Sequence, residues 1–273
     1  MTSEREDPIG VFDSGAGGLT VVRTLLDRLP AERVVYFGDT GYVPYGPRPP
    51  GQIRRFAADA CRFLCSHGAK LIVMGCNMSS AMALEEAREA AGCPVLGTIE
   101  AGAQAAVEAS PGGRIGVAAT EGTVKSGAYE RAIRALLPAA EVYEQACPLL
   151  VPAVEAGAQD GFLHDAVGES LRPLRDRRPD TVILGCTHYP LVRSEIQLFL
   201  GPEVQLVDPA ETLAEQAAQE LAALGLHART RPERPLTCYA SGSADSLRLW
   251  AQRVLGLEVG EVERIDIHGT AGV

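Results

Sequence analysis

Short apolar segments recur along the chain, and stretches with helical spacing of apolar residues lie between them. Continuous apolar runs of this length are typical of parallel strands that are covered on both faces of a sheet. The segments 52–66 and 211–224 have the amphipathic pattern of helices that cover such a sheet. The expected strands are IGVF from Ile9, RVVYFG from Arg33, KLIVMG from Lys70, PVLG from Pro94, RIGVA from Arg114, EVYEQ from Glu141, TVILG from Thr181 and VQLV from Val204. The pattern predicts an α/β protein whose ligand site lies beyond the carboxyl ends of parallel strands.

Two pairs of segments suggest that the chain contains two related α/β halves. IGVFDSG from Ile9 is similar to IGVAATEG from Ile115, and VMGCN around Cys76 is similar to ILGCT around Cys186. The two pairs are separated by nearly equal lengths of chain, so each half would send one strand-end cysteine toward a shared cleft.

The length of 273 residues fits one large α/β unit or two domains. Helix and strand patterns resume after Asp208-Pro209, so we expect this last segment to complete the first domain. We therefore predict a discontinuous first domain formed by residues 1–98 and 208–273, and a second domain formed by residues 99–207.

Composition narrows the class of protein. A net charge of −10 disfavours binding to a nucleic-acid backbone, which requires clustered Lys and Arg. No apolar run is long enough to span a membrane, and the polar, acidic first residues MTSEREDP do not resemble a secretory signal, so we expect a cytoplasmic protein. The seven cysteines include no CxxC pair, which argues against a disulfide framework and a structural zinc site.

Three strand-to-helix loops carry candidate chemistry. The glycines of the Asp13–Gly18 loop allow a backbone approach to an anion near a helix N-terminus, although an ordinary capped turn explains them equally. Cys76 follows an expected strand, and the positive end of the next helix would lower its pKa. Cys186 follows another strand with His188 beside it, which can hold a proton or orient a neighbour. For both thiols the alternative is an inert buried cysteine.

The remaining features are weaker. A Cys-x-His pair provides too few ligands for a metal site, so we expect no metal. The turn-rich loop 39–47 could form one wall of a cleft or serve a structural role. We expect the other cysteines to be bystanders: Cys61, Cys65, Cys93, Cys147 and Cys238.

At these residues the sequence resembles the glutamate racemase family of the wider aspartate/glutamate racemase superfamily. The similar segments cover the chain to about Asp208 and are IGVFDSGAGGLTV, YFGDT, PYG, GCN, ATEGTVKSGAY, VPAVEAG and GCTHYPL. The resemblance implies two flavodoxin-like parallel-sheet domains related by approximate internal symmetry, with the active site in the cleft between them. It also implies a homodimer that uses neither pyridoxal phosphate nor a metal, and whose small-molecule substrates are L- and D-glutamate.

The resemblance assigns roles to residues of this chain. Cys76 and Cys186 match the two catalytic cysteines of the family. By this resemblance Cys76 would deprotonate D-glutamate and Cys186 would deprotonate L-glutamate. Asp13, Glu155 and His188 match the polar groups that assist them. The expected substrate-binding positions are Asp13, Ser14, Tyr45, Gly46, Asn77, Met78, Thr120, Thr123, Thr187 and His188.

Met78 is a departure, because the family commonly has threonine at this position. The side chain of methionine cannot donate the lost hydrogen bond. We therefore expect Met78→Thr to leave glutamate as the preferred substrate and to lower its KM. The alternative is a Met78 packed in the core, where the same substitution would cost stability without a kinetic gain.

The chemistry fits a racemase, because inversion at Cα requires one base to remove a proton and another to deliver one on the opposite face. Donors in a closed site must then stabilise the substrate carboxylate as carbanion character develops. Aspartate racemase is the nearest alternative, and a hydrolase with a single cysteine nucleophile is another. Inhibition of DNA gyrase is a third possibility that no feature of the sequence specifically supports.

Overall fold

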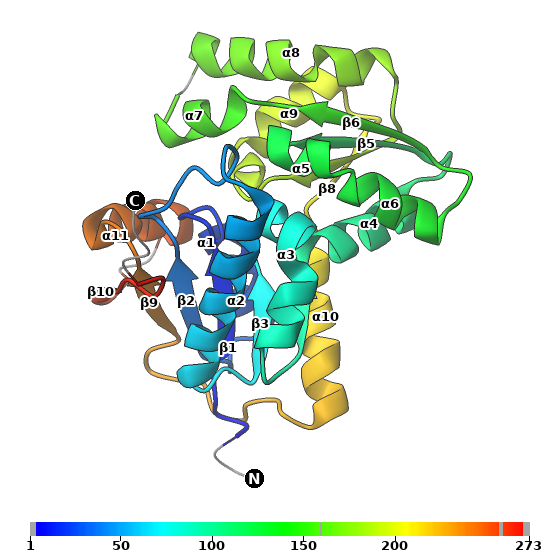
Figure 1. Cartoon of the computed structure of the whole chain (residues 1–273). Coiled ribbons are helices and arrows are strands. Elements are labelled where there is room, and N and C mark those ends of the chain that lie inside the picture. The colour runs from blue at the N-terminus through cyan, green and yellow to red at the C-terminus, as the bar shows by residue number, and fades with distance from the viewer. Residues whose placement is uncertain (1–3, 159, 257–258, 270–273) are drawn as a thin grey trace. The chain divides into compact units, whose positions relative to one another are not determined.

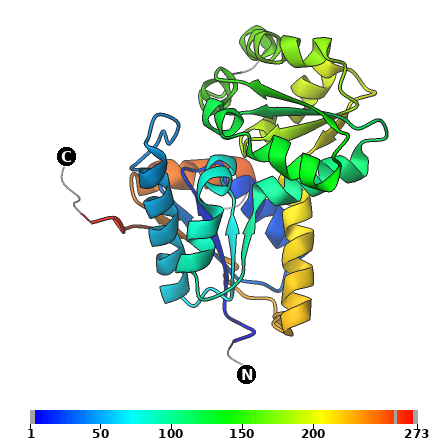
Figure 2. The same ribbon diagram turned by 45° about the vertical axis from the view of Figure 1, so that its right-hand side comes forward.

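The computed structural model describes residues 4–158, 160–256 and 259–269, which form two compact units (Figures 1 and 2). The first unit comprises residues 1–97 and 213–273, and the second comprises residues 98–212. The chain thus leaves the first unit at the end of its fourth strand, β4 (Val95–Gly97), and returns to it within a helix, α10 (Pro209–Leu224).

Across its described residues, the first unit contains a six-stranded sheet in the order β10-β9-β2-β1-β3-β4. Every pair of neighbouring strands is parallel. The strands are β1 (Ile9–Asp13), β2 (Val34–Gly38), β3 (Leu71–Met74), β4 (Val95–Gly97), β9 (Leu236–Ala240) and β10 (Val262–Arg264). The central strands β1, β2 and β3 are buried along their whole length, as their continuous apolar sequences predict.

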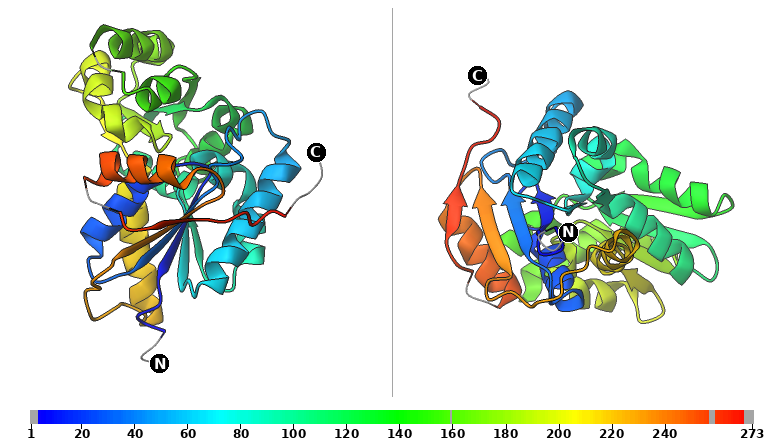
Figure 3. Two further views of the ribbon diagram at one scale, coloured as in Figure 1. Left: turned by 90° about the vertical axis from the view of Figure 1, so that its left-hand side faces the viewer. Right: turned by 90° about the horizontal axis from the view of Figure 1, so that it is seen from below.

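Helices cover both faces of this sheet (Figure 3, left). They are α1 (Leu19–Arg28), α2 (Pro50–Ser66), α3 (Asn77–Ala90), α10 and α11 (Ala244–Leu255). Helix α2 packs against α3 on one face, while α1 packs against α11 on the other. Helix α2 begins with Pro50, which is compatible with a first helical turn, and buries the stripe formed by Ile53, Phe56, Ala60 and Leu64.

The described part of the second unit contains a four-stranded parallel sheet in the order β6-β5-β7-β8. Its strands are β5 (Arg114–Ala119), β6 (Glu141–Ala146), β7 (Thr181–Gly185) and β8 (Gln205–Val207). Its helices are α4 (Thr98–Ala109), α5 (Glu121–Ser126), α6 (Ala128–Leu136), α7 (Leu150–Glu155), α8 (Asp160–Asp176) and α9 (Arg193–Leu200), with a short 3₁₀ helix, η1 (Tyr189–Val192).

The prediction of an α/β fold with parallel sheets is confirmed. All eight strands expected from the apolar runs are present, and the segment beyond Asp208 supplies β9 and β10 to the first sheet. The sequence-based domain limits, at 98–99 and 207–208, remain a prediction.

Candidate functional site

The first group of candidate residues lies at the carboxyl edge of the first sheet. Asp13 ends β1, Asp39 follows β2 and Cys76 follows β3 after one glycine, and β1 pairs with both other strands. The backbone continues this pairing beyond the strands, since Asp39 N–H donates to the Asp13 carbonyl at 2.9 Å and Gly75 N–H donates to the Phe12 carbonyl at 2.8 Å. Parallel pairing therefore brings three chemically active side chains to one edge of the sheet.

Cys76 caps the N-terminus of α3. Its Sγ accepts a hydrogen bond from Ser79 N–H at 3.4 Å and lies 3.3 Å from Ser14 Oγ. The side chain is buried, with Cys76 7% exposed. The sequence predicted the strand-end position of this thiol but did not identify Ser79 as a partner, because that contact depends on the cap geometry.

The expectation of a lowered pKa for Cys76 is wrong. Burial raises the pKa of this thiol, and the negative charge of Asp13 raises it further. Hydrogen bonds from Ser14 and Ser79 favour the thiolate but are outweighed. Cys76 is therefore mainly a thiol at neutral pH, and its ionisation requires a proton acceptor.

Asp13 is held by the glycine-rich loop that follows it. The Gly15 N–H donates to Asp13 Oδ1 at 2.7 Å, and Asp13 is 2% exposed. A side chain at Gly18 would place its Cβ 2.6 Å from Asp13 Cβ, so only glycine fits there. The loop glycines thus let the chain turn tightly around a buried carboxylate next to Cys76.

Two expected substrate positions lie in the loop between β2 and α2. Tyr45 is buried and its hydroxyl donates to Asp39 Oδ2 at 2.5 Å, whereas Gly46 is exposed. Because the Tyr45 hydroxyl already binds Asp39, a substrate contact from this position would come from the backbone. Asn77, the first residue of α3, is buried directly after Cys76.

Met78 belongs to the apolar core of the first unit. It is 7% exposed and lies in the same buried cluster as Phe56, Met74 and Tyr45. This placement is the one that the packing alternative requires, and a role of Met78 in substrate binding stays a prediction.

We therefore expect Met78→Thr to destabilise the first unit by about 1–3 kcal/mol, because it shortens a core side chain and buries a hydroxyl. The KM for glutamate should stay unchanged. Thermal melting and steady-state kinetics on the same preparation measure both quantities. Met78→Leu is the matched control, since it keeps the volume and apolar character of the site; a lower KM for the threonine variant without loss of stability would contradict packing.

The second group of candidate residues follows β7 in the second unit. Cys186 and Thr187 are each 8% exposed and lie at the carboxyl edge of the second sheet. Cys186 Sγ lies 3.8 Å from His188 Nδ1. The strand-end position predicted for Cys186 is thus the one observed, with the imidazole within weak hydrogen-bonding distance of the thiol.

Glu155 extends this group from the end of α7. Its Oε1 lies 3.0 Å from His188 Nε2, so the thiol, the imidazole and the carboxylate form a continuous series. The hydrogen bond from His188 lowers the pKa of Glu155 against the opposing effect of burial, and the charge of His188 also lowers it. In the neutral form of His188, an ionised Glu155 favours a proton on Nε2, which leaves Nδ1 able to accept a proton from Cys186.

The two expected threonines lie together at the start of α5. Thr120 Oγ1 and Thr123 Oγ1 are 3.1 Å apart, and Thr123 is 1% exposed. Thr120 is the N-cap residue of α5 and follows β5, the strand next to β7. Both hydroxyls therefore lie at the same carboxyl edge of the second sheet as Cys186.

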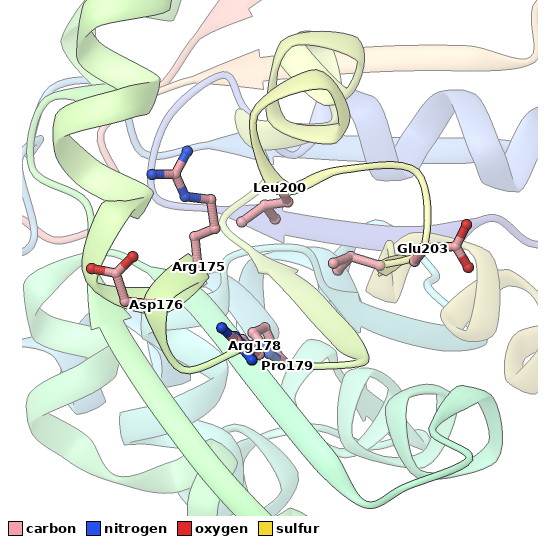
Figure 4. A pocket seen from close by; sticks show the side chains of 7 residues that line it. Arg175, Asp176, Arg178, Pro179, Leu200 and Glu203 are labelled. Carbon is pink, nitrogen blue, oxygen red and sulfur yellow. The ribbon is translucent and has the colours of Figure 1, made fainter.

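A separate surface pocket lies at the amino edge of the second sheet (Figure 4). Its lining residues are Arg175, Asp176, Arg178, Pro179, Leu200, Glu203 and Val204. Pro179 precedes β7 and Val204 precedes β8, whereas Cys186 follows β7. This pocket contains none of the expected site residues and is not the candidate active site.

Within the described ranges 4–158, 160–256 and 259–269, no group of three or more His, Cys, Asp and Glu side chains is arranged to bind a metal ion. None of the helices in these ranges has the length and apolar character needed to cross a membrane.

Comparisons with known proteins agree with the fold. The family model described as Asp/Glu/Hydantoin racemase matches residues 9–217. A glutamate racemase from Desulforudis audaxviator is 46% identical over 264 residues, which cover 94% of this chain and 97% of that protein. The crystal structure of a glutamate racemase from Bacillus anthracis superimposes with a TM-score of 0.92 at 36% identity, and that of the Francisella tularensis enzyme in complex with D-glutamate does so with a TM-score of 0.89 at 33% identity. Each structural match covers 96% of this chain and 98% of the other.

Proposed function

Because this chain belongs to the Asp/Glu/hydantoin racemase family, we propose that it is a glutamate racemase that interconverts L- and D-glutamate. The observation that carries this proposal is the presence of two buried strand-end thiols, each next to its own acid–base partner. Cys76 has Asp13 beside it, and Cys186 has the His188–Glu155 pair.

The two thiols act as the two bases of the reaction. One starts as a thiolate and removes the α-proton, while the other starts as a thiol and delivers a proton to the opposite face of the planar intermediate. After each turnover the two cysteines have exchanged protonation states, and the reverse reaction then restores them. Atoms and charges balance within these steps, since one proton leaves Cα and one proton arrives.

Each thiol needs a neighbour that accepts its proton, because burial disfavours the thiolate. Asp13 serves Cys76, and Nδ1 of His188 serves Cys186 with Glu155 holding the imidazole. We assign the substrate carboxylates to donors at the two sheet edges: Ser14, Asn77, Thr120, Thr123, Thr187 and the backbone at Tyr45 and Gly46. Met78 would contribute to this set through its backbone alone.

A cysteine hydrolase is the alternative that the second unit by itself favours. The Cys186–His188–Glu155 series has the order of a nucleophile, a base and an orienting acid. A hydrolase would not need Cys76 or Asp13, however, and it would form a covalent acyl-enzyme. Aspartate is the alternative substrate within the family.

The proposal is tested by incubating the purified protein separately with L-glutamate, D-glutamate and L-aspartate, without added cofactor, and following optical rotation. We expect loss of rotation with either glutamate enantiomer and little change with aspartate. In deuterated water, deuterium should appear at Cα of the product enantiomer. Faster racemisation of aspartate, or a requirement for pyridoxal phosphate, would contradict the assignment.

The raised pKa of Cys76 predicts a pH dependence that differs between the two directions. The direction begun by the Cys76 thiolate, which the family assigns to D-glutamate, requires the minor ionisation state at neutral pH. Its kcat should increase by up to about tenfold per pH unit from neutral pH until the thiol pKa is reached. Steady-state kcat values for each enantiomer across this range provide the measurement, and a D-glutamate kcat that is constant or falls as pH rises would contradict the prediction.

We further propose that the enzyme supplies D-glutamate for peptidoglycan synthesis, that it works in the cytoplasm without nucleic acid or membrane partners, and that it forms a homodimer. The family relationship supports the biosynthetic role. The net charge of −10 argues against nucleic-acid binding. Light scattering of the purified protein tests the dimer directly.

A further inference from the structure

The segment after β10, residues 265–269, connects the C-terminal part of the first unit to the β2–α2 loop through side-chain contacts. Ile265 N–H donates to the Ala240 carbonyl at 2.9 Å, and Ile265 and Ile267 pack against the apolar core. Figure 3 shows this red segment crossing from the sheet edge toward α2. The family model ends at residue 217, so the segment lies outside the matched region.

His268 is the polar centre of this contact. Its Nε2 lies 3.0 Å from Asp39 Oδ2 and its Nδ1 lies 3.2 Å from Asp59 Oδ2. The side chain is 1% exposed, and its ring stacks on Phe56 with centroids 4.1 Å apart. A buried imidazole between two carboxylates joins three separate elements: the C-terminal segment, the residue after β2, and α2.

The charges around His268 favour its protonated form. Burial alone lowers the pKa of His268, but the hydrogen bonds and charges of Asp39 and Asp59 outweigh it, so the pKa is raised. Only the imidazolium can donate from both nitrogens, as this geometry requires. Further charged groups lie nearby. Asp266 Oδ1 accepts from the backbone N–H of His268, Arg62 forms an ion pair with Asp59, and Arg48 and Arg55 lie over the neighbouring aromatic rings.

Asp39 transmits this contact to the β2–α2 loop. It is 0% exposed, and the same Oδ2 that faces His268 accepts the Tyr45 hydroxyl. A second hydrogen bond between the same two segments runs from the Tyr42 hydroxyl to the Asp266 carboxylate. Without His268, the buried carboxylate of Asp39 would lose the cation that balances its charge and would keep only the Tyr45 hydroxyl on Oδ2. A buried charge without a counter-charge is costly.

We propose that His268 is a positioning residue, which acts through Asp39 and Tyr45 to hold the backbone at positions 45 and 46 ready for the substrate. The inference rests on the proposed racemase function, because those two positions matter through substrate binding. His268 itself does not touch the reacting atoms.

A double-mutant cycle with His268→Ala and Tyr45→Phe tests the proposal. We expect His268→Ala to raise the KM for both glutamate enantiomers roughly tenfold, the size typical of losing a hydrogen bond to a charged group, with a smaller change in kcat. Because both residues act through Asp39, the double variant should have nearly the KM of the worse single variant. Free imidazole should lower the KM of His268→Ala by filling the vacated space, and the exposed His164 provides the control His164→Ala.

The inference fails if His268→Ala keeps the wild-type KM, which is also what a general loss of stability would leave while lowering the apparent kcat. It fails too if the KM effects of the two substitutions multiply and imidazole restores nothing, because the two residues would then act independently. If His268→Ala does not fold, His268→Gln takes its place in the cycle, since its amide retains a donor. Failure of the racemase function itself is recognised separately, because the wild-type protein would then not racemise glutamate at all.

Discussion

Cys76→Ala and Cys186→Ala are each expected to lower racemisation by at least about 100-fold in both directions, the lower limit of typical general acid–base contributions. Both thiols are needed because a proton must leave one face of Cα and another must arrive at the opposite face. Removing either one leaves a half-reaction without its acid or without its base. The loss should appear equally in kcat and in kcat/KM, because each thiol stabilises the transition state of proton transfer and not the bound substrate.

Cys238→Ala is the matched control for these variants. Cys238 is 0% exposed within β9, so it experiences the same loss of a buried sulfur without a place at the carboxyl edge of the sheet. Its substitution should leave kcat unchanged. Full racemisation by Cys76→Ala or by Cys186→Ala would refute the two-base reaction. If an acyl-enzyme is trapped on Cys186 and Cys76→Ala turns over at the wild-type rate, the protein is a hydrolase.

The sequence predicted strands well where both faces are buried. β1, β3 and β7 combine continuous apolar sequence with complete burial, so their pattern is unambiguous. β6 is an edge strand of mixed composition and largely half-buried, and its pairing with β5 depends on the rest of the sheet. The mixed sequences of β9 and β10 do not indicate which strand each would pair with, and only the return of the chain to the first unit determines this.

The same distinction applies to the candidate site. The positions of Cys76 and Cys186 follow from local sequence, because each comes directly after a buried strand. The contact between His188 and Glu155 joins residues from different elements, so only family resemblance could indicate it. The direction of the Cys76 pKa shift depends on burial depth and on Asp13, which the strand-end position does not reveal.

The role of His268 could not be predicted from the sequence. No local motif surrounds it, and its partners Asp39 and Asp59 are distant in the chain and belong to different elements. Tertiary packing alone creates the pair of carboxylates that gives this histidine its chemistry.

Asp13→Asn is expected to lower kcat roughly tenfold or more in the direction begun by Cys76, and to have a smaller effect in the opposite direction. The asparagine has nearly the same shape, and its amide oxygen can still accept the Gly15 N–H, so the loop and the fold should persist. What is lost is the carboxylate charge and its ability to take a proton from the adjacent thiol. Asp27→Asn, at an exposed position on α1, is the surface control.

The same substitution should move the ionisation of Cys76 in a direction that a simple loss of stability would not produce. The negative charge of Asp13 raises the pKa of Cys76, so its removal should lower that pKa and increase the thiolate fraction at a given pH. The ultraviolet absorbance of thiolate, compared between Asp13→Asn and the double variant Asp13→Asn/Cys76→Ala, isolates this thiol from the other cysteines. The enzyme would then hold more Cys76 thiolate and yet turn over more slowly in the direction that thiolate begins. Such a combination is expected only if Asp13 acts as a proton acceptor during turnover, because a purely electrostatic role would make the variant faster in that direction. Equal kcat losses in both directions with an unchanged thiol pKa would instead indicate that Asp13 only shapes the loop.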